Sequence, residues 1–174
     1  MGGRPKRYRY FGIRDVPEET VRKRQQLLVY RNSVESVVSD YHYLLPNRLL
    51  AQGSAPPPVS GIPFDVVVLA AQEYQPVLPI EYEVLHVPLD DGPPPDKTTR
   101  MRIRRAAREI ADRVRAGQRV LVTCWQGRNR SGVLAGLAMV DLGVPPLHAV
   151  HRIRHLRNGL TNLHFRNMVA SGRV

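Results

Sequence analysis

The chain has 174 residues, 43% of them hydrophobic and 24% charged, and 26 Lys and Arg against 15 Asp and Glu give a formal charge of +11. This composition predicts one folded globular domain and argues against a second full domain or a disordered chain. No stretch approaches the roughly 20 apolar residues of a membrane-spanning helix, so we expect a cytoplasmic protein without a transmembrane segment. The positive charge favours an acidic partner or substrate, although genomic base composition can produce the same excess of arginine.

The N-terminal part of the chain differs in pattern from the rest. Residues 1–14 are basic and aromatic without periodicity, and we interpret them as a flexible arm that could contact a polyanion. Residues 15–40 are predicted to form an accessory helix, because Asp15 and Glu18 have the spacing of a capping box. The remaining residues, 41–174, are predicted to form the main domain.

Strand signals dominate the first half of this domain. Short strand-like runs occur at 41–45 and 48–52, and a turn-rich segment follows at 53–61. Three further strands are predicted at 64–70, 81–87 and 119–123. The first and last of these three are continuous apolar runs, as expected for strands that are buried on both faces of a sheet.

Helical patterns alternate with the later strands. An arginine-rich amphipathic helix is predicted for 98–116, where Gly117 stops it, and a helix of small residues for 133–143. Two more helices are predicted, at 147–158, ended by Gly159, and at 162–171. The alternation predicts an α/β fold with a central, mostly parallel sheet flanked by helices.

The junction between the strand at 119–123 and the helix at 133–143 carries the candidate site. It reads Cys-x5-Arg-Ser, with Cys124, Arg130 and Ser131 in the fixed positions. The intervening residues are Trp125, Gln126, Gly127, Arg128 and Asn129. An α/β fold places ligands at such junctions, and a loop of this length can turn its N–H groups inward to bind a phosphate at the helix N-terminus.

Each fixed position suits phosphate chemistry. Arg130 can donate two parallel hydrogen bonds to phosphate oxygens. The loop donors favour the thiolate form of Cys124, which would make it a nucleophile. Ser131 can donate to the sulfur or cap the helix. Cys124 is the only cysteine, so internal disulfides and multi-cysteine zinc sites are excluded; a buried structural cysteine is the competing interpretation, which the motif disfavours.

The loop CWQGRNRSG resembles the active-site loop of the protein tyrosine phosphatase superfamily, in its compact dual-specificity branch. The resemblance covers about residues 41–171: NRLLAQGS and GIPFDVVVLA resemble the opening strands, HVPLDDGPP the general-acid loop, and RIRHLRNGLTNLHF a later helical region through Arg157, Asn162 and Phe165. It implies a cysteine-phosphatase fold with an extra N-terminal helix. It also implies phosphomonoester hydrolysis through a phosphocysteine intermediate, without metal or cofactor, on a phosphorylated protein or another acidic phosphorylated substrate.

The family's mechanism also requires a carboxylic acid, and the resemblance implies Asp91, three residues after Pro88. Asp90 is the alternative, and Asp96 is interpreted as a helix cap. One position departs from the family, which has histidine immediately before the cysteine, where this chain has Thr123. Because that histidine organises the loop and acidifies the thiol, Thr123 leaves the acidity of Cys124 open.

Alternative functions remain at this point. The run from Gly127 to Ser131 is similar to that of RNA 5′-triphosphatases, which typically lack the acid-loop aspartate, and Arg128 resembles a feature of phosphatases of phosphoinositides and phospholipids. Thr123 also motivates a pseudophosphatase that binds phosphate without turnover. Three histidines share a helical stripe, His148, His151 and His155; without a third-ligand motif, we interpret them as part of a basic solvated face and expect no metal site.

Overall fold

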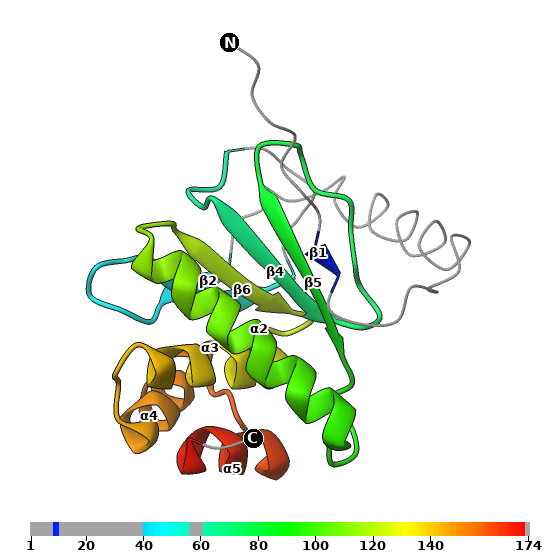
Figure 1. Ribbon diagram of the computed structural model, residues 1–174, viewed down its shortest axis with the longest axis vertical. Helices are drawn as coiled ribbons and strands as arrows, with labels where there is room; N and C mark the ends of the chain where they lie inside the picture. The colour runs from blue at the N-terminus through cyan, green and yellow to red at the C-terminus, as the bar shows by residue number, and fades with distance from the viewer. Residues whose placement is uncertain (1–8, 11–39, 56–60, 173–174) are drawn as a thin grey trace.

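The structure is a computed structural model that describes residues 9–10, 40–55 and 61–172 (Figure 1). The predicted accessory helix lies outside the described residues, apart from Asp40 at its end. Of the predicted arm, only Arg9–Tyr10 is described, and it forms a short strand, β1. No helix in the described ranges is long and apolar enough to cross a membrane.

The central sheet has six strands in the order β1-β5-β4-β6-β3-β2. After β1 these are β2 (Tyr41–Tyr43), β3 (Leu50–Ser54), β4 (Val66–Ala71), β5 (Glu83–Leu89) and β6 (Val120–Cys124). Every pairing is parallel except that of β2 with β3, which confirms the predicted mostly parallel sheet. All residues of β4 and β6 are buried, as their continuous apolar runs predicted.

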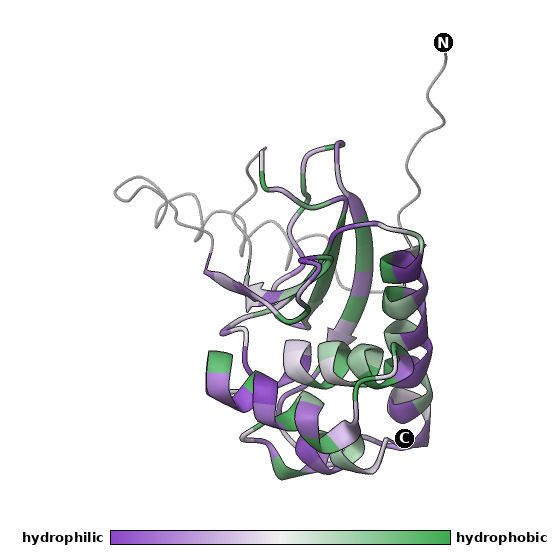
Figure 2. Ribbon diagram, turned by 90° about the vertical axis from the view of Figure 1, so that its left-hand side faces the viewer, coloured by the Kyte–Doolittle hydropathy of each residue, from purple (hydrophilic) through white to green (hydrophobic). Residues whose placement is uncertain are grey.

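Four described helices accompany the sheet: α2 (Lys97–Arg115), α3 (Arg130–Asp141), α4 (Pro146–Arg157) and α5 (Leu163–Ser171). Helices α2 and α3 pack beside each other against the sheet, and α4 and α5 pack on α3 (Figure 1). Figure 2 shows hydrophobic residues along the central strands and hydrophilic residues on the outer side of α2. The buried side of α2 includes four positions at helical spacing, Ile103, Ala107, Ile110 and Val114, as an amphipathic helix requires.

Alternation along β4 divides the core between the two faces of the sheet. Val66 and Val68 belong to the large core that α2 and α3 share, whereas Val67 and Leu69 pack on the opposite face. Helix α3 is buried over its first ten residues, so it has no polar face. This burial fixes the N-terminus of α3, which begins after a loop of five residues that follows β6.

Most predicted element ends were shifted by one to three residues, and two of these shifts occur where a non-glycine residue adopts the left-handed conformation. Leu44 lies beyond β2, where its N–H donates to Leu50, and Arg48 has a left-handed φ of 58°, so β3 begins at Leu50. Helix α4 ends at Arg157, because Asn158, rather than Gly159, adopts the left-handed conformation that stops it. Gly159 is needed for a close approach, since a Cβ there would lie 2.7 Å from the Arg128 carbonyl oxygen.

Candidate active site

Cys124 is the last residue of β6, and its side chain is only 2% exposed. Its Sγ lies 3.2 Å from Oγ of Ser131, in the first turn of α3. The strand and helix therefore bring together a thiol and a hydroxyl seven positions apart. This places the sulfur below the N-terminus of α3, where the partial positive charge of the helix favours an anion.

The carbonyl groups of the loop between them point toward the scaffold. Arg157 donates from Nε to the Gly127 oxygen at 3.1 Å and from Nη2 to the Gln126 oxygen at 3.3 Å. The side-chain amide of Gln52, on β3, donates to the Gly127 and Arg128 oxygens at 3.1 and 3.2 Å. These contacts hold the loop from its outer side.

The N–H groups of the loop are left for a ligand. Among the described residues, none of the backbone N–H groups of residues 126–129 donates a hydrogen bond. Because the carbonyls face the scaffold, consecutive N–H groups form a concave set of donors that suits an oxyanion. Gly127 makes this path possible: its φ is 64°, and a Cβ would lie 2.4 Å from the carbonyl carbon of Gly53.

Arg130 is buried and paired with Glu73, in the segment after β4. Both terminal nitrogens donate to the Glu73 carboxylate, Nη2 at 2.6 Å, and Nη1 also reaches the Leu89 carbonyl oxygen at 3.3 Å. Burial alone would lower the pKa of Arg130, but the hydrogen bonds and charge of Glu73 hold it above its ordinary value. Nε is buried without a partner among the described residues, so one edge of the guanidinium is available for a phosphate.

The two candidate acids have different partners. Asp91 accepts a hydrogen bond from Nδ2 of Asn129 at 3.3 Å, which directs its carboxylate toward the loop. Asp90 accepts from the N–H of Gly92 at 3.0 Å and thus holds its own turn. Asp96 caps α2 by accepting from the N–H of Thr99 at 2.7 Å, which confirms its interpretation as a helix cap.

Asn129 joins three segments around the site. Besides its bond to Asp91, its Oδ1 accepts from the N–H groups of Thr161 and Asn162 at 2.8 and 3.2 Å. Asn162 in turn donates from Nδ2 to the Asp91 carbonyl oxygen at 3.1 Å. The loop, the acid-loop residue and the α4–α5 connection are therefore held as one hydrogen-bonded unit.

No protein-family model and no curated protein sequence matches the chain. Solved structures, in contrast, match the chain. A mouse protein described as a dual specificity phosphatase, complexed with zinc tungstate, has a TM-score of 0.66 at 20% identity and covers 82% of this chain and 91% of its own. Human DUSP28 has a TM-score of 0.63 at 20% identity, with 80% and 97% covered, and PTPMT1 in complex with PI(5)P has 0.58 at 14%, with 76% and 93% covered.

The chain has the fold of a dual-specificity phosphatase. This confirms the cysteine-phosphatase fold that the loop resemblance implied. At these identities the likeness concerns the fold, and the chemistry depends on the side chains of the site.

Thr123, the departure from the phosphatase pattern, does not take part in the loop. Its Oγ1 donates to the carbonyl oxygen of Val68 at 2.8 Å, across the pairing of β4 with β6. The hydroxyl is therefore used inside the sheet, and the loop must be organised by other residues.

Trp125 and Arg128 are exposed side chains of the loop between β6 and α3. Trp125 is 41% exposed, and its ring meets the buried Tyr74 edge-to-face, with centroids 5.8 Å apart and an interplanar angle of 78°. Burial raises the pKa of Tyr74 to about 12. Arg128 is exposed as well, so both side chains lie on the solvent side of the loop.

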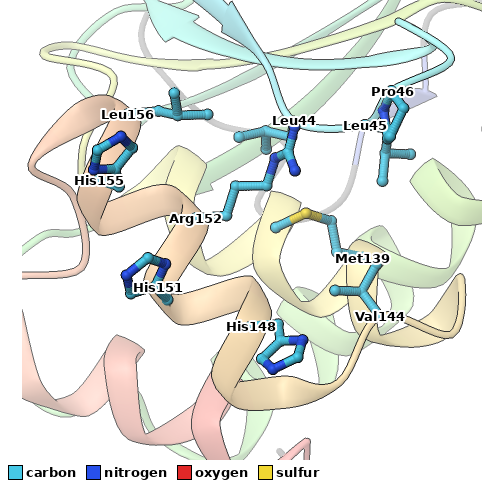
Figure 3. Close-up of a pocket in the computed structure, with 10 residues that line it drawn as sticks. All are labelled: Leu44, Leu45, Pro46, Met139, Val144, His148, His151, Arg152, His155 and Leu156. Carbon is cyan, nitrogen blue, oxygen red and sulfur yellow. The ribbon is translucent and has the colours of Figure 1, made fainter.

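The histidine stripe lies elsewhere, beside a pocket of about 590 Å³ along α4 (Figure 3). His148, His151 and His155 are exposed, and the rings of the last two stack with centroids 6.1 Å apart. None of the lining residues belongs to the loop between β6 and α3. Within the described part of the chain, no group of three His, Cys, Asp or Glu residues could hold a metal ion.

Two residues of the site were missed by sequence reasoning, Gln52 and Glu73. Gln52 had one available signal, because it is a polar residue at the end of a predicted strand. Glu73 lies in an irregular segment that no pattern connects to Arg130. Arg157 and Asn162 were found, but only through the resemblance.

Proposed function

We propose that the protein is a cytoplasmic, cysteine-dependent protein tyrosine or dual-specificity phosphatase that acts through a phosphocysteine intermediate. One observation supports this above all: the Sγ of Cys124, the loop N–H groups and the unpartnered Nε edge of Arg130 belong to one loop around one helix N-terminus. These groups supply a nucleophile and donors for the three equatorial oxygens of a transferring phosphoryl group.

The residues divide the reaction into two steps. In the first, the Cys124 thiolate attacks phosphorus, the ester P–O bond breaks, and Asp91 gives its proton to the departing oxygen. In the second, Asp91 takes a proton from the attacking water, the S–P bond breaks, and inorganic phosphate leaves. The Ser131 hydroxyl, 3.2 Å from Sγ, stabilises the departing thiolate. Neither step needs a metal or a cofactor.

The proposed substrate class rests on two features, the candidate acid Asp91 and the exposed side chains of the loop. Asp91 is bonded to Asn129, which favours phosphoproteins over triphosphate-ended RNA, since the RNA triphosphatases that the loop resembles typically lack this acid. Exposed Arg128 and the similarity to PTPMT1, solved with PI(5)P, favour phosphoinositides as the second candidate. The basic arm, residues 1–14, is proposed as an additional contact for a polyanionic substrate.

The test is phosphate release from an aryl phosphate, phosphopeptides, phosphoinositides and triphosphate-ended RNA, with Cys124→Ser as the control. We expect the aryl phosphate and phosphotyrosine peptides to be hydrolysed and the variant to be inactive. A wild type no faster than Cys124→Ser on every substrate would overturn the proposal. Vanadate binding with no turnover would identify a phosphate-binding pseudophosphatase instead.

A further inference from the structure

Gln52 is a fully buried polar residue in contact with the active-site loop. Its Nε2 lies 3.0 Å from Oγ of Ser131, and 3.1 and 3.2 Å from the carbonyl oxygens of Gly127 and Arg128. Its Oε1 is buried without a partner among the described residues. A half-satisfied buried amide is costly, so its position calls for a role in the site.

The orientation of this amide is determined by its neighbours. Two carbonyl oxygens, which can only accept, lie within 3.2 Å of Nε2. A flipped amide would place its oxygen against both of them, which is electrostatically unfavourable. Gln52 therefore donates toward the loop, and it also donates to the Ser131 hydroxyl.

Donation from Gln52 affects the direction of the next hydrogen bond. A serine hydroxyl has one proton and two lone pairs, and Gln52 occupies one lone pair. The proton of Oγ is then free to point at Sγ of Cys124, 3.2 Å away. Because a donated hydrogen bond polarises the hydroxyl, it becomes a stronger donor to a thiolate.

We propose that Gln52 is a positioning residue that acts through Ser131 to stabilise the Cys124 thiolate, in place of the histidine that the phosphatase pattern has at Thr123. Thr123 cannot do this, because its hydroxyl is bonded to Val68. The carbonyls of Gly127 and Arg128 keep second donors, from Arg157 and the N–H of Leu160. Removing the amide therefore affects Ser131 more than the path of the loop. This inference extends the proposed function.

The experiment measures thiolate formation directly, because Cys124 is the only cysteine of the chain and is therefore the only thiol that can give a signal. Thiolate formation is followed by ultraviolet absorbance and by iodoacetate alkylation against pH, in wild type, Gln52→Leu, Ser131→Ala and the double variant. We expect alkylation at pH 6 to slow about tenfold in Gln52→Leu, in the range by which local donors change thiolate populations. The double variant should match Ser131→Ala alone, because the effect of Gln52 passes through the hydroxyl.

Thr123→Val is the matched control, because it removes a buried hydrogen bond of β6, the strand that ends at Cys124, and this bond does not involve the loop. It should leave the thiolate titration in place. Thermal unfolding shows whether Gln52→Leu folds. If it does not, Gln52→Met is used in its place, because methionine keeps the length of the side chain. An unchanged titration in the Gln52 variant, additive effects in the double variant, or an equal change in Thr123→Val would each overturn the inference.

The alkylation readout requires no substrate, so it separates this inference from the proposed function. A shifted titration in a protein that hydrolyses nothing would support the role of Gln52 and overturn the proposed catalysis. If the wild type hydrolyses phosphate esters but the thiol titration of Gln52→Leu is unshifted, the proposed function stands and the role of Gln52 is overturned.

Discussion

The candidate phosphate-binding loop, residues 124–131, and the candidate acid loop, residues 88–96, are in contact but are held in different ways. The first accepts hydrogen bonds from buried Gln52 and from Arg157, whose side chain is only 5% exposed. The second is mostly exposed, and Asp91 is held by two asparagines, Asn129 and Asn162. A loop held by buried groups is preorganised, whereas an exposed loop with few contacts opens at low cost.

This difference separates two kinds of defect. Changes in the phosphate-binding loop should impair both oxyanion binding and turnover, because its donors contact the phosphate throughout the reaction. Changes in the acid loop should impair turnover alone, because a proton donor matters when a bond breaks.

Arg130→Lys should give the largest effect. Lysine keeps the charge but cannot both pair with the Glu73 carboxylate and present a second edge to phosphate. We expect kcat/KM for an aryl phosphate to fall about 1000-fold and vanadate binding to weaken. Arg119→Lys is the matched control, because Arg119 makes a similar pair with Asp65 at the opposite end of β6. Near-normal activity of Arg130→Lys would contradict the proposal that the Arg130 guanidinium binds the phosphate.

Asp91→Asn should lower kcat about 100-fold while vanadate binding stays near the wild-type value. The loss should be larger for phenyl phosphate than for p-nitrophenyl phosphate, because the poorer leaving group depends more on protonation. Asp90→Asn, one residue earlier, is the control and should show no such dependence, as its carboxylate holds Gly92. If the two variants exchange behaviours, Asp90 is the acid.

Glu73→Gln should have a smaller effect than either of these changes, because it acts on phosphate binding only through Arg130. Glutamine keeps the shape but removes the charge that holds Arg130, at a cost of about 2 kcal/mol, or roughly 30-fold in kcat/KM. Glu83→Gln serves as the control, since Glu83 makes an equivalent two-point pair with Arg113 far from the loop. Equal effects of both changes on kcat/KM would show that Glu73 contributes only to stability.

The sequence predicted the parts of the site that are local in the chain. Cys124, Arg130 and Ser131 lie within one strand-loop-helix junction, so their spacing alone placed them together. The sheet order brings Gln52 to the loop through the pairing of β3 with β6, and a segment after β4 brings Glu73 to Arg130. These contacts depend on tertiary packing between residues more than 50 positions apart, which no periodicity encodes.

The same limit applies to the fold. Apolar runs predicted β4 and β6, because burial on both faces leaves a continuous signal. The ends of β3 and α4 were wrong, because each depends on a non-glycine residue, Arg48 or Asn158, adopting the left-handed conformation. Asp91 over Asp90 remains a prediction from the resemblance, and the structure adds the contact between Asn129 and the Asp91 carboxylate.

Buried His86 predicts a pH dependence of stability for the segment that carries Glu73. Its Nδ1 lies 2.8 Å from Oε1 of Gln75. Nε2 of Gln75 donates to the carbonyl oxygens of Leu69 and Ala71 and so anchors the segment that carries Glu73. Burial lowers the pKa of His86 from 6.5 to about 4. Between these values the unfolded chain binds more protons than the folded one, so stability is full above pH 6.5 and declines as the pH falls toward 4.

The expected loss in the free energy of unfolding between pH 8 and pH 5.5 is about 1.4 kcal/mol from this group, measured by urea unfolding at each pH. His86→Asn should remove that part of the slope, whereas His164→Asn, at an exposed position, should retain it. If the slope is the same in His86→Asn, the buried imidazole is not its source. If His86→Asn removes this pH dependence of stability and also lowers the activity at low pH, the neutral histidine stabilises the segment that carries Glu73.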